Sequence, residues 1–138
     1  MLRMMGKDAM RIPGLVALLL MGSSWNSDVA QAHHSTAGIY NEDTVVEISG
    51  RVKEWRFVNP HPSLIVEVAG PDGQLQEWDI SYGGPAVTHL KRQGYTVDTF
   101  RPGDEIVARG YAAKVETAFG LLIVGHPTRT DGSRIIGD

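Results

Sequence analysis

Short runs of β-branched and aromatic residues, separated by proline and glycine turns, constrain the fold of this chain most. The runs cover residues 44–57, 63–68, 75–80, 105–111 and 119–124. Within 63–68 the apolar residues Leu64, Val66 and Val68 alternate with the others, as in a strand that turns one face to a core. The pattern therefore predicts a β-rich domain with five main strands.

One segment between the third and fourth runs has helical character instead. Gly83-Gly84-Pro85 opens it, Val87 and Leu90 lie three residues apart on one face, and Gly94 stands where a helix ends. Three strands, one short helix and two strands is the order of a small five-stranded OB-like barrel. Another small open barrel or sandwich is the alternative.

Gly50 interrupts the alternation of the first run and predicts a bulge or a sharp bend there. Ile135-Ile136 could add a short final strand. The residues expected to face the interior of the barrel are Val46, Ile48, Val52, Leu64, Val66, Val68, Ile106 and Val124.

The first residues have the pattern of an export signal. Positive charges at Arg3, Lys7 and Arg11 precede an apolar run over residues 12–21, and Ala30-Gln31-Ala32 supplies a small-x-small cleavage site. The run is about half of the ~20 residues that a spanning helix needs, and an uncleaved anchor is the alternative. We expect a signal peptide over residues 1–32, an arm over residues 33–43, and a barrel domain over residues 44–138. The cleaved domain would work in the periplasm without a stable membrane anchor.

The composition of the exported part narrows its function. It is mildly acidic and has no basic run, so we expect no nucleic-acid partner. The chain has no cysteine, which excludes thiol redox chemistry and cysteine-ligated metals. It also lacks Gly-x-Ser-x-Gly, Ser-x-x-Lys and glycine-rich phosphate loops. We therefore expect a binding protein and no enzyme; a hydrolase with Glu77 and Asp79 as acid and base is the weakest alternative.

Short motifs are spread in order along nearly the whole chain. They are Ala32-His33-His34-Ser35, Gly50-x-Val52, Val58-Asn59-Pro60-His61, Asp72-Gly73 before Trp78, Gly84-Pro85 through Leu90 to Gly94, and Pro102-Gly103-Asp104 followed by Gly110. Together they resemble an uncharacterised family of exported bacterial proteins, the domain of unknown function sixty-one fifty-two. Members of that family carry an aromatic residue soon after the histidine pair, where this chain has Thr36 and, further on, Tyr40. The resemblance implies export and the architecture, but no activity.

Four of the five histidines are candidate metal ligands: His33, His34, His61 and His126. Cleavage would make His33 the N-terminal residue, and its α-amine and imidazole Nδ1 can then chelate one ion. A further imidazole would complete a nitrogen set that suits Cu(II). His61, held between two prolines, is preorganised for this role, and His126 is a second candidate. A solvated arm and a loop histidine with a purely structural hydrogen bond are the alternatives.

Four aromatic residues around the first and third strands offer a metal-free alternative: Trp55, Phe57, Trp78 and Tyr82. OB-type barrels bind sugars and other ligands on such faces, although the same rings could simply fill the core. We therefore expect a periplasmic, non-enzymatic binding protein. In one hypothesis it binds Cu(II) or another divalent metal through its N-terminal histidine. In the other it uses its aromatic face to bind an unknown periplasmic protein or a small ligand.

Overall fold

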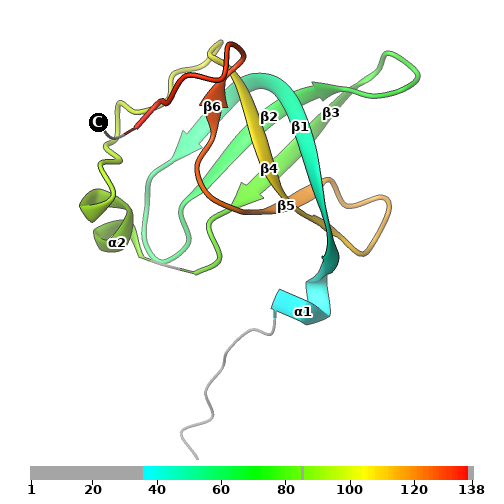
Figure 1. The fold of residues 1–138 in the computed structure, drawn as a ribbon, viewed down its shortest axis with the longest axis horizontal. Coiled ribbons are helices and arrows are strands. Elements are labelled where there is room, and N and C mark those ends of the chain that lie inside the picture. Colours follow the sequence, from blue (N-terminus) through cyan, green and yellow to red (C-terminus); the bar gives the residue numbers. More distant parts are fainter. Residues whose placement is uncertain (1–35, 85, 137–138) are drawn as a thin grey trace, which may run out of the picture. The chain divides into compact units, whose positions relative to one another are not determined.

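The computed structural model describes residues 36–84 and 86–136 (Figure 1). The elements are α1 (Thr36–Ile39), β1 (Tyr40–Arg56), β2 (Ser63–Ala69), β3 (Leu75–Ser81), α2 (Val87–Arg92), β4 (Glu105–Ala113), β5 (Gly120–Ile123) and β6 (Thr128–Arg129). The predicted β-rich fold is confirmed, with α2 between β3 and β4 as expected. None of the described helices is long and apolar enough to cross a membrane.

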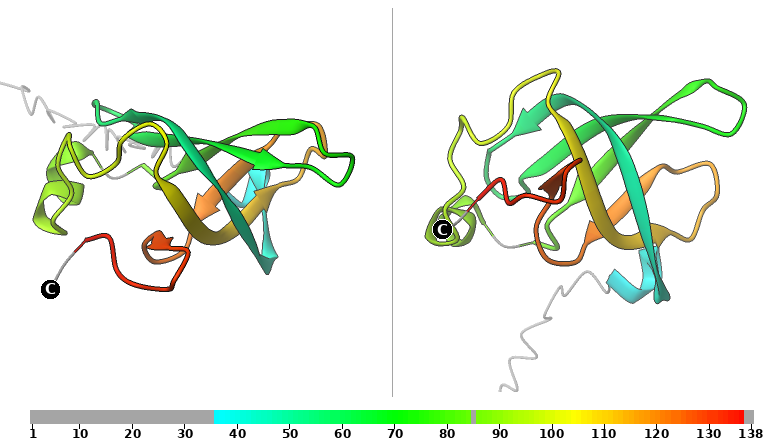
Figure 2. Two further views of the ribbon diagram at one scale, coloured as in Figure 1. Left: turned by 90° about the horizontal axis from the view of Figure 1, so that it is seen from above. Right: turned by 45° about the horizontal axis from the view of Figure 1, so that its top comes forward.

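The sheet closes into a five-stranded barrel. Its strand order is β1-β2-β3-β5-β4, and β4 pairs in turn with β1. All neighbouring strands are antiparallel except β3 and β5, which run parallel. Figures 1 and 2 show β1 arching over the barrel so that it borders both β2 and β4. This arrangement is the predicted OB-like barrel.

A bent β1 makes the closure possible. Residues 45–51 of β1 pair with β4, and residues 51–56 pair with β2, with the register shifted between Val52 and Glu54. The bulge was expected at Gly50 and lies just beyond it. Gly50 has a different role: a Cβ there would lie 2.4 Å from the backbone oxygen of Glu67, so only glycine lets β2 approach this closely.

The interior is filled from all five barrel strands and from the segment around α2. Its buried members are Ile48, Val52, Leu64, Val66, Ile80, Tyr82, Leu90, Tyr95, Phe100, Ile106, Ala108 and Leu121. Val46 and Val68 are partly buried against this cluster, so seven of the eight inward residues that we expected are confirmed. The prediction for Val124 was wrong, because its side chain is 43% exposed. In β5 it is Leu121 and Ile123 that turn inward, and the alternation places Val124 outside.

Both ends of the domain differ from the expected boundaries. β1 begins at Tyr40 instead of Thr44, after the short helix α1. The last strand is β6, which pairs with the start of β4, whereas Ile135 and Ile136 pack against the core outside any strand.

Helix α2 ends as its glycine predicted. Gly94 has a φ of 98°, its N–H donates to the backbone oxygen of Lys91, and the N–H of Tyr95 donates to that of Leu90. These two bonds form a Schellman motif, which pairs backbone oxygens that a helix end leaves free. Leu90 and Tyr95, the residues that such a motif brings together, are each 1% exposed. The helix end therefore delivers the Tyr95 ring into the core.

Gly110 is a second position at which close strand packing leaves no room for a side chain. It pairs with Val46 of β1 on one side and with Ile123 of β5 on the other. A Cβ at this position would lie 2.2 Å from the backbone oxygen of Leu122, a contact that rigid backbone cannot relieve.

We predict that Gly110→Ala destabilises the barrel by about 3 kcal/mol or more, since overpacking against backbone forces strands apart. Gly120→Ala is the matched control, because its Cβ would make an ordinary 3.5 Å contact with the Cβ of Ala113. The control should be neutral or stabilising by about 0.5 kcal/mol, as expected for replacing a strand glycine. Denaturant unfolding measures both, and equal stability of the two variants would contradict the packing described here.

Candidate functional site

The expected metal ligands lie in three places. His33 and His34 are outside the described residues. His61 is exposed in the β1–β2 loop, and His126 is exposed after β5. Within residues 36–84 and 86–136, no three His, Cys, Asp or Glu side chains are placed to share one ion. A site of the predicted kind therefore needs His33 or His34.

The loop that carries His61 is anchored by a contact that the sequence did not predict. Pro62 is buried, and the side-chain oxygen of Asn59 accepts a hydrogen bond from the N–H of Val87 at 3.0 Å. Val87 is the first residue of α2, whose N-cap residue Ala86 has no side chain that could accept this bond. The loop thus supplies the missing cap of α2, and this bond holds the loop and the helix together.

His126 is tied to the core by one ring nitrogen. Its Nδ1 lies 2.9 Å from the hydroxyl oxygen of Tyr95. The imidazole also lines a cavity of about 370 Å³, which we call the C-terminal cavity. Its lining residues are Gln93, His126, Pro127, Thr128, Arg134 and Ile136. His61 is not among them.

Three of the four expected aromatic residues belong to one cluster at the end of the barrel nearest α2. Trp55 is its centre, with ring centroids 5.2 Å from Phe57, 5.7 Å from Tyr82, 6.0 Å from Tyr95 and 5.1 Å from Phe100. The indole N–H of Trp55 donates to the backbone oxygen of Thr96 at 2.9 Å. We call the five rings of this cluster the aromatic end: Trp55, Phe57, Tyr82, Tyr95 and Phe100.

Trp78 is not part of the aromatic end. It faces Val66 across the β2–β3 pair, and its ring centroid lies 5.7 Å from that of Phe119. Trp78 packs against the barrel core. The structure therefore divides the predicted aromatic set into a cluster of three and one separate residue.

Tyr95 and Phe100 were missed by the sequence reasoning, although each carried a usable signal. Tyr95 follows the glycine that ends α2, the position that commonly packs back on the helix. Phe100 precedes the Pro102-Gly103 turn, directly before β4. Both lie in the connection between α2 and β4, and they close the aromatic end over Trp55.

The aromatic end has an apolar, accessible rim. Trp55 and Phe57 are only partly buried. Next to Phe57 in the chain, Val58 is 60% exposed. Val97, which follows the residue that accepts the Trp55 bond, is 67% exposed. Trp55 at the end of β1, Phe57 and Val58 in the β1–β2 loop, and Val97 in the connection after α2 thus leave apolar surface exposed.

Two buried phenols lie beneath this rim. The hydroxyl of Tyr82 has no hydrogen-bond partner among the described residues, and this side chain is 9% exposed. Burial, and then the neighbouring Tyr95, raises the pKa of Tyr82 well above its ordinary value. Burial also raises the pKa of Tyr95 to about 12. Both phenols therefore stay protonated at neutral pH. Tyr95 can therefore donate to His126.

We predict opposite effects when the two hydroxyls are removed. Tyr82→Phe should raise the free energy of unfolding by about 1 kcal/mol, because it removes a buried hydroxyl without a partner. Tyr95→Phe should lower it by about 1 kcal/mol, because it breaks the bond to His126. Chemical denaturation at neutral pH measures both. A loss of stability in Tyr82→Phe equal to that in Tyr95→Phe would show that the Tyr82 hydroxyl is satisfied.

Comparison with known proteins identifies the family of this chain but does not indicate an activity. No curated protein is similar enough to match this chain. The model of one family, described as a family of unknown function (DUF6152), matches residues 23–122, which is well over half of the chain. This confirms the resemblance noted from the ordered motifs, and the chain belongs to the family of unknown function DUF6152.

Proposed function

We propose that this chain is an exported, non-enzymatic binding protein of the periplasm, and that it recognises a partner protein or a small ligand with its aromatic end. The observation that carries the proposal is the Trp55 cluster, whose rings Trp55 and Phe57 are only partly buried and whose flanking loops carry the exposed valines Val58 and Val97. Aromatic side chains supply large contact areas and are enriched at interfaces.

The loops that bear this surface are held in place before any ligand arrives. The bond from Val87 to Asn59 anchors the β1–β2 loop, and the bond from Trp55 to Thr96 anchors the connection after α2. A surface that is already ordered loses little conformational entropy on binding. Single exposed valines are ordinary on protein surfaces, so it is the place of these two in the anchored loops that flank the cluster that favours recognition. OB-type barrels also bind ligands with faces and loops of this kind.

Export is supported by the order of charge, apolar run and cleavage site in residues 1–32. Cleavage after Ala32 would leave His33 as the first residue of the periplasmic protein. The intact mass of the purified protein tests this directly.

We predict that native mass spectrometry of protein isolated from the periplasm detects a bound species that depends on the rim. Val58→Lys should reduce the bound fraction at least about tenfold, because it puts a charge into an apolar contact. Val124→Lys is the matched control, since Val124 is also an exposed valine and is no part of the aromatic end. Equal retention in both variants would refute recognition by the aromatic end.

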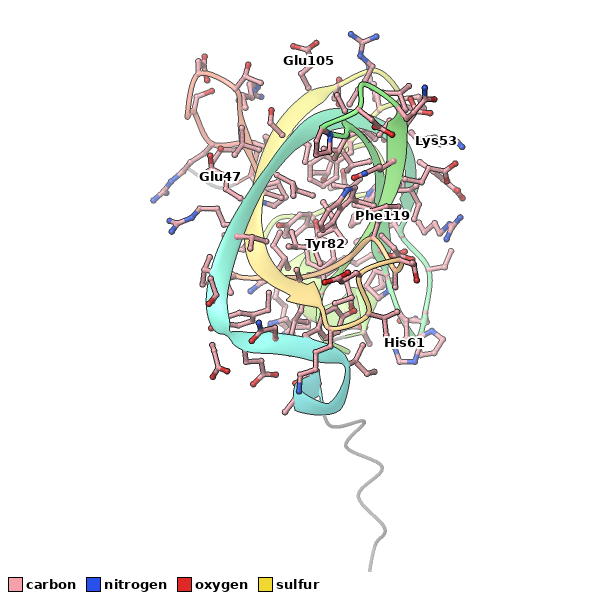
Figure 3. The ribbon with its side chains drawn as sticks, turned by 90° about the vertical axis from the view of Figure 1, so that its right-hand side faces the viewer. Glu47, Lys53, His61, Tyr82, Glu105 and Phe119 are labelled. Atoms are coloured by element: carbon pink, nitrogen blue, oxygen red, sulfur yellow. The ribbon has the colours of Figure 1, made fainter. Side chains whose placement is uncertain are left out.

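Binding of Cu(II) by His33, His34 and His61 is the second candidate, and the position of His61 favours it. His61 is exposed on its anchored loop, where Figure 3 shows it at the edge of the barrel. The α-amine and imidazole of His33 would chelate the ion, and His61 would add a ligand. No cysteine competes for the metal.

We predict that Cu(II) binds the mature protein more tightly than about 1 µM, and that binding weakens as the pH falls, because the ligands must lose protons. A Gly added before His33 should abolish this binding, and His61→Ala should weaken it. A Cu(II) titration of the three proteins measures both effects. Equal binding by all three would place any copper elsewhere.

A further inference from the structure

The C-terminal cavity is built from three segments that lie far apart in the sequence. Gln93 caps the end of α2, His126 to Thr128 lead from β5 into β6, and Arg134 and Ile136 belong to the C-terminal segment. That segment passes beside α2 in Figures 1 and 2. It is held there because Arg134 forms a β-bridge with Thr128 and its backbone oxygen accepts a bond from the guanidinium of Arg129. The cavity walls are therefore tied to one another.

Hydrogen-bond donors dominate the polar lining of this cavity. Gln93 brings an amide, His126 an imidazole, Thr128 a hydroxyl and Arg134 a guanidinium, and none of the six lining residues is a carboxylate. Among the described residues, the carboxylate closest along the chain to Arg134 is that of Asp131, which accepts a bond from the N–H of Ser133 at 2.8 Å. A cationic fork and several donors, with no acid among the described lining residues, favour an anion.

The bond between His126 and Tyr95 orients the imidazole for such a ligand. Tyr95 is 1% exposed, so its hydroxyl is a fixed partner for Nδ1. When Tyr95 donates to Nδ1, the proton of a neutral imidazole resides on Nε2, which then presents an N–H donor. An anion in the cavity selects this tautomer.

Arg134 supplies the charge. Its guanidinium forms no ion pair with any other residue in the described part of the chain, where the ion pairs are Arg51–Glu105, Lys53–Glu77, Arg56–Glu54 and Arg109–Glu47. A guanidinium binds a carboxylate through two parallel hydrogen bonds, which adds geometric selectivity to the attraction.

The remaining wall is apolar. Pro127 is fully buried and Ile136 is partly buried, and both line the cavity. The volume of about 370 Å³ falls within the range of small-molecule sites. From the donors, the charge and this apolar wall, we infer that the C-terminal cavity binds a small organic carboxylate, with the carboxylate on Arg134 and His126 and the apolar part on Pro127 and Ile136. The residues that line this cavity are not those of the rim of the aromatic end. The inference is therefore independent of the proposed function, and either can fail without the other.

The test uses benzoate as the probe, with benzyl alcohol as its uncharged analogue and inorganic phosphate as an anion without an apolar part. Calorimetric titration of the mature protein should give saturable benzoate binding with a Kd of about 1 mM or below. Benzyl alcohol and phosphate should bind at least about tenfold more weakly. Arg134→Gln should weaken benzoate binding at least about tenfold. Arg101→Gln, at an exposed arginine outside the cavity, should leave it unchanged.

NMR of the unaltered protein keeps the test independent of how well Arg134→Gln folds. Benzoate should shift the imidazole ¹⁵N signals of His126 and the side-chain amide of Gln93. The absence of benzoate binding, phosphate binding as tight as that of benzoate, or undiminished binding in Arg134→Gln would each overturn the inference. Val58→Lys should bind benzoate normally, and loss of binding in that variant alone would move the ligand to the aromatic end.

Discussion

The pairing of β1 along both of its edges is the constraint on which the rest of this domain depends. One strand can border β4 with its first half and β2 with its second half only if it bends and changes register on the way. Gly50 allows the close approach to β2, and the bulge beyond it turns the strand. Gly110 permits a similarly close approach of β5 to β4. In the closed barrel, each of the five strands is hydrogen-bonded to a neighbour on both of its edges over at least part of its length.

The bulge also determines what the barrel presents at the aromatic end. Before the bulge, the inward side chains of β1 are those of Val46, Ile48 and Val52. After it, the inward side chains are those of Trp55 near the end of β1 and of Phe57 just beyond the strand. The change of parity therefore turns two large rings toward the core and leaves Glu54 and Arg56 on the surface, where they pair with each other. Without the bulge these charges would point inward, and the cluster around Trp55 would not form.

Features of the fold and of the candidate site could be predicted from the sequence where they depend on a few neighbouring residues, and not where they depend on distant contacts. Alternation within 63–68 and the glycine after α2 are properties of a few neighbouring residues, and both predictions are confirmed. The side on which Val124 lies depends on the register of β5 against β4, which is set by distant pairings, and there the prediction failed. Trp78 was grouped with Trp55 because their strands are close in sequence order, yet ring contacts are decided in three dimensions. The C-terminal cavity could not be predicted, since it joins α2, the segment after β5 and the C-terminal segment.

Recognition by the aromatic end is the central claim, and the indole N–H signals of residues 33–138 test it most directly. This part of the chain has two tryptophans, one inside the aromatic end and one outside it. In a ¹H–¹⁵N spectrum recorded while the species bound in the periplasm is added back, the Trp55 signal should shift in proportion to occupancy and the Trp78 signal should stay in place. A shift confined to Trp78, or a bound complex in which the Trp55 signal is unmoved, would contradict it.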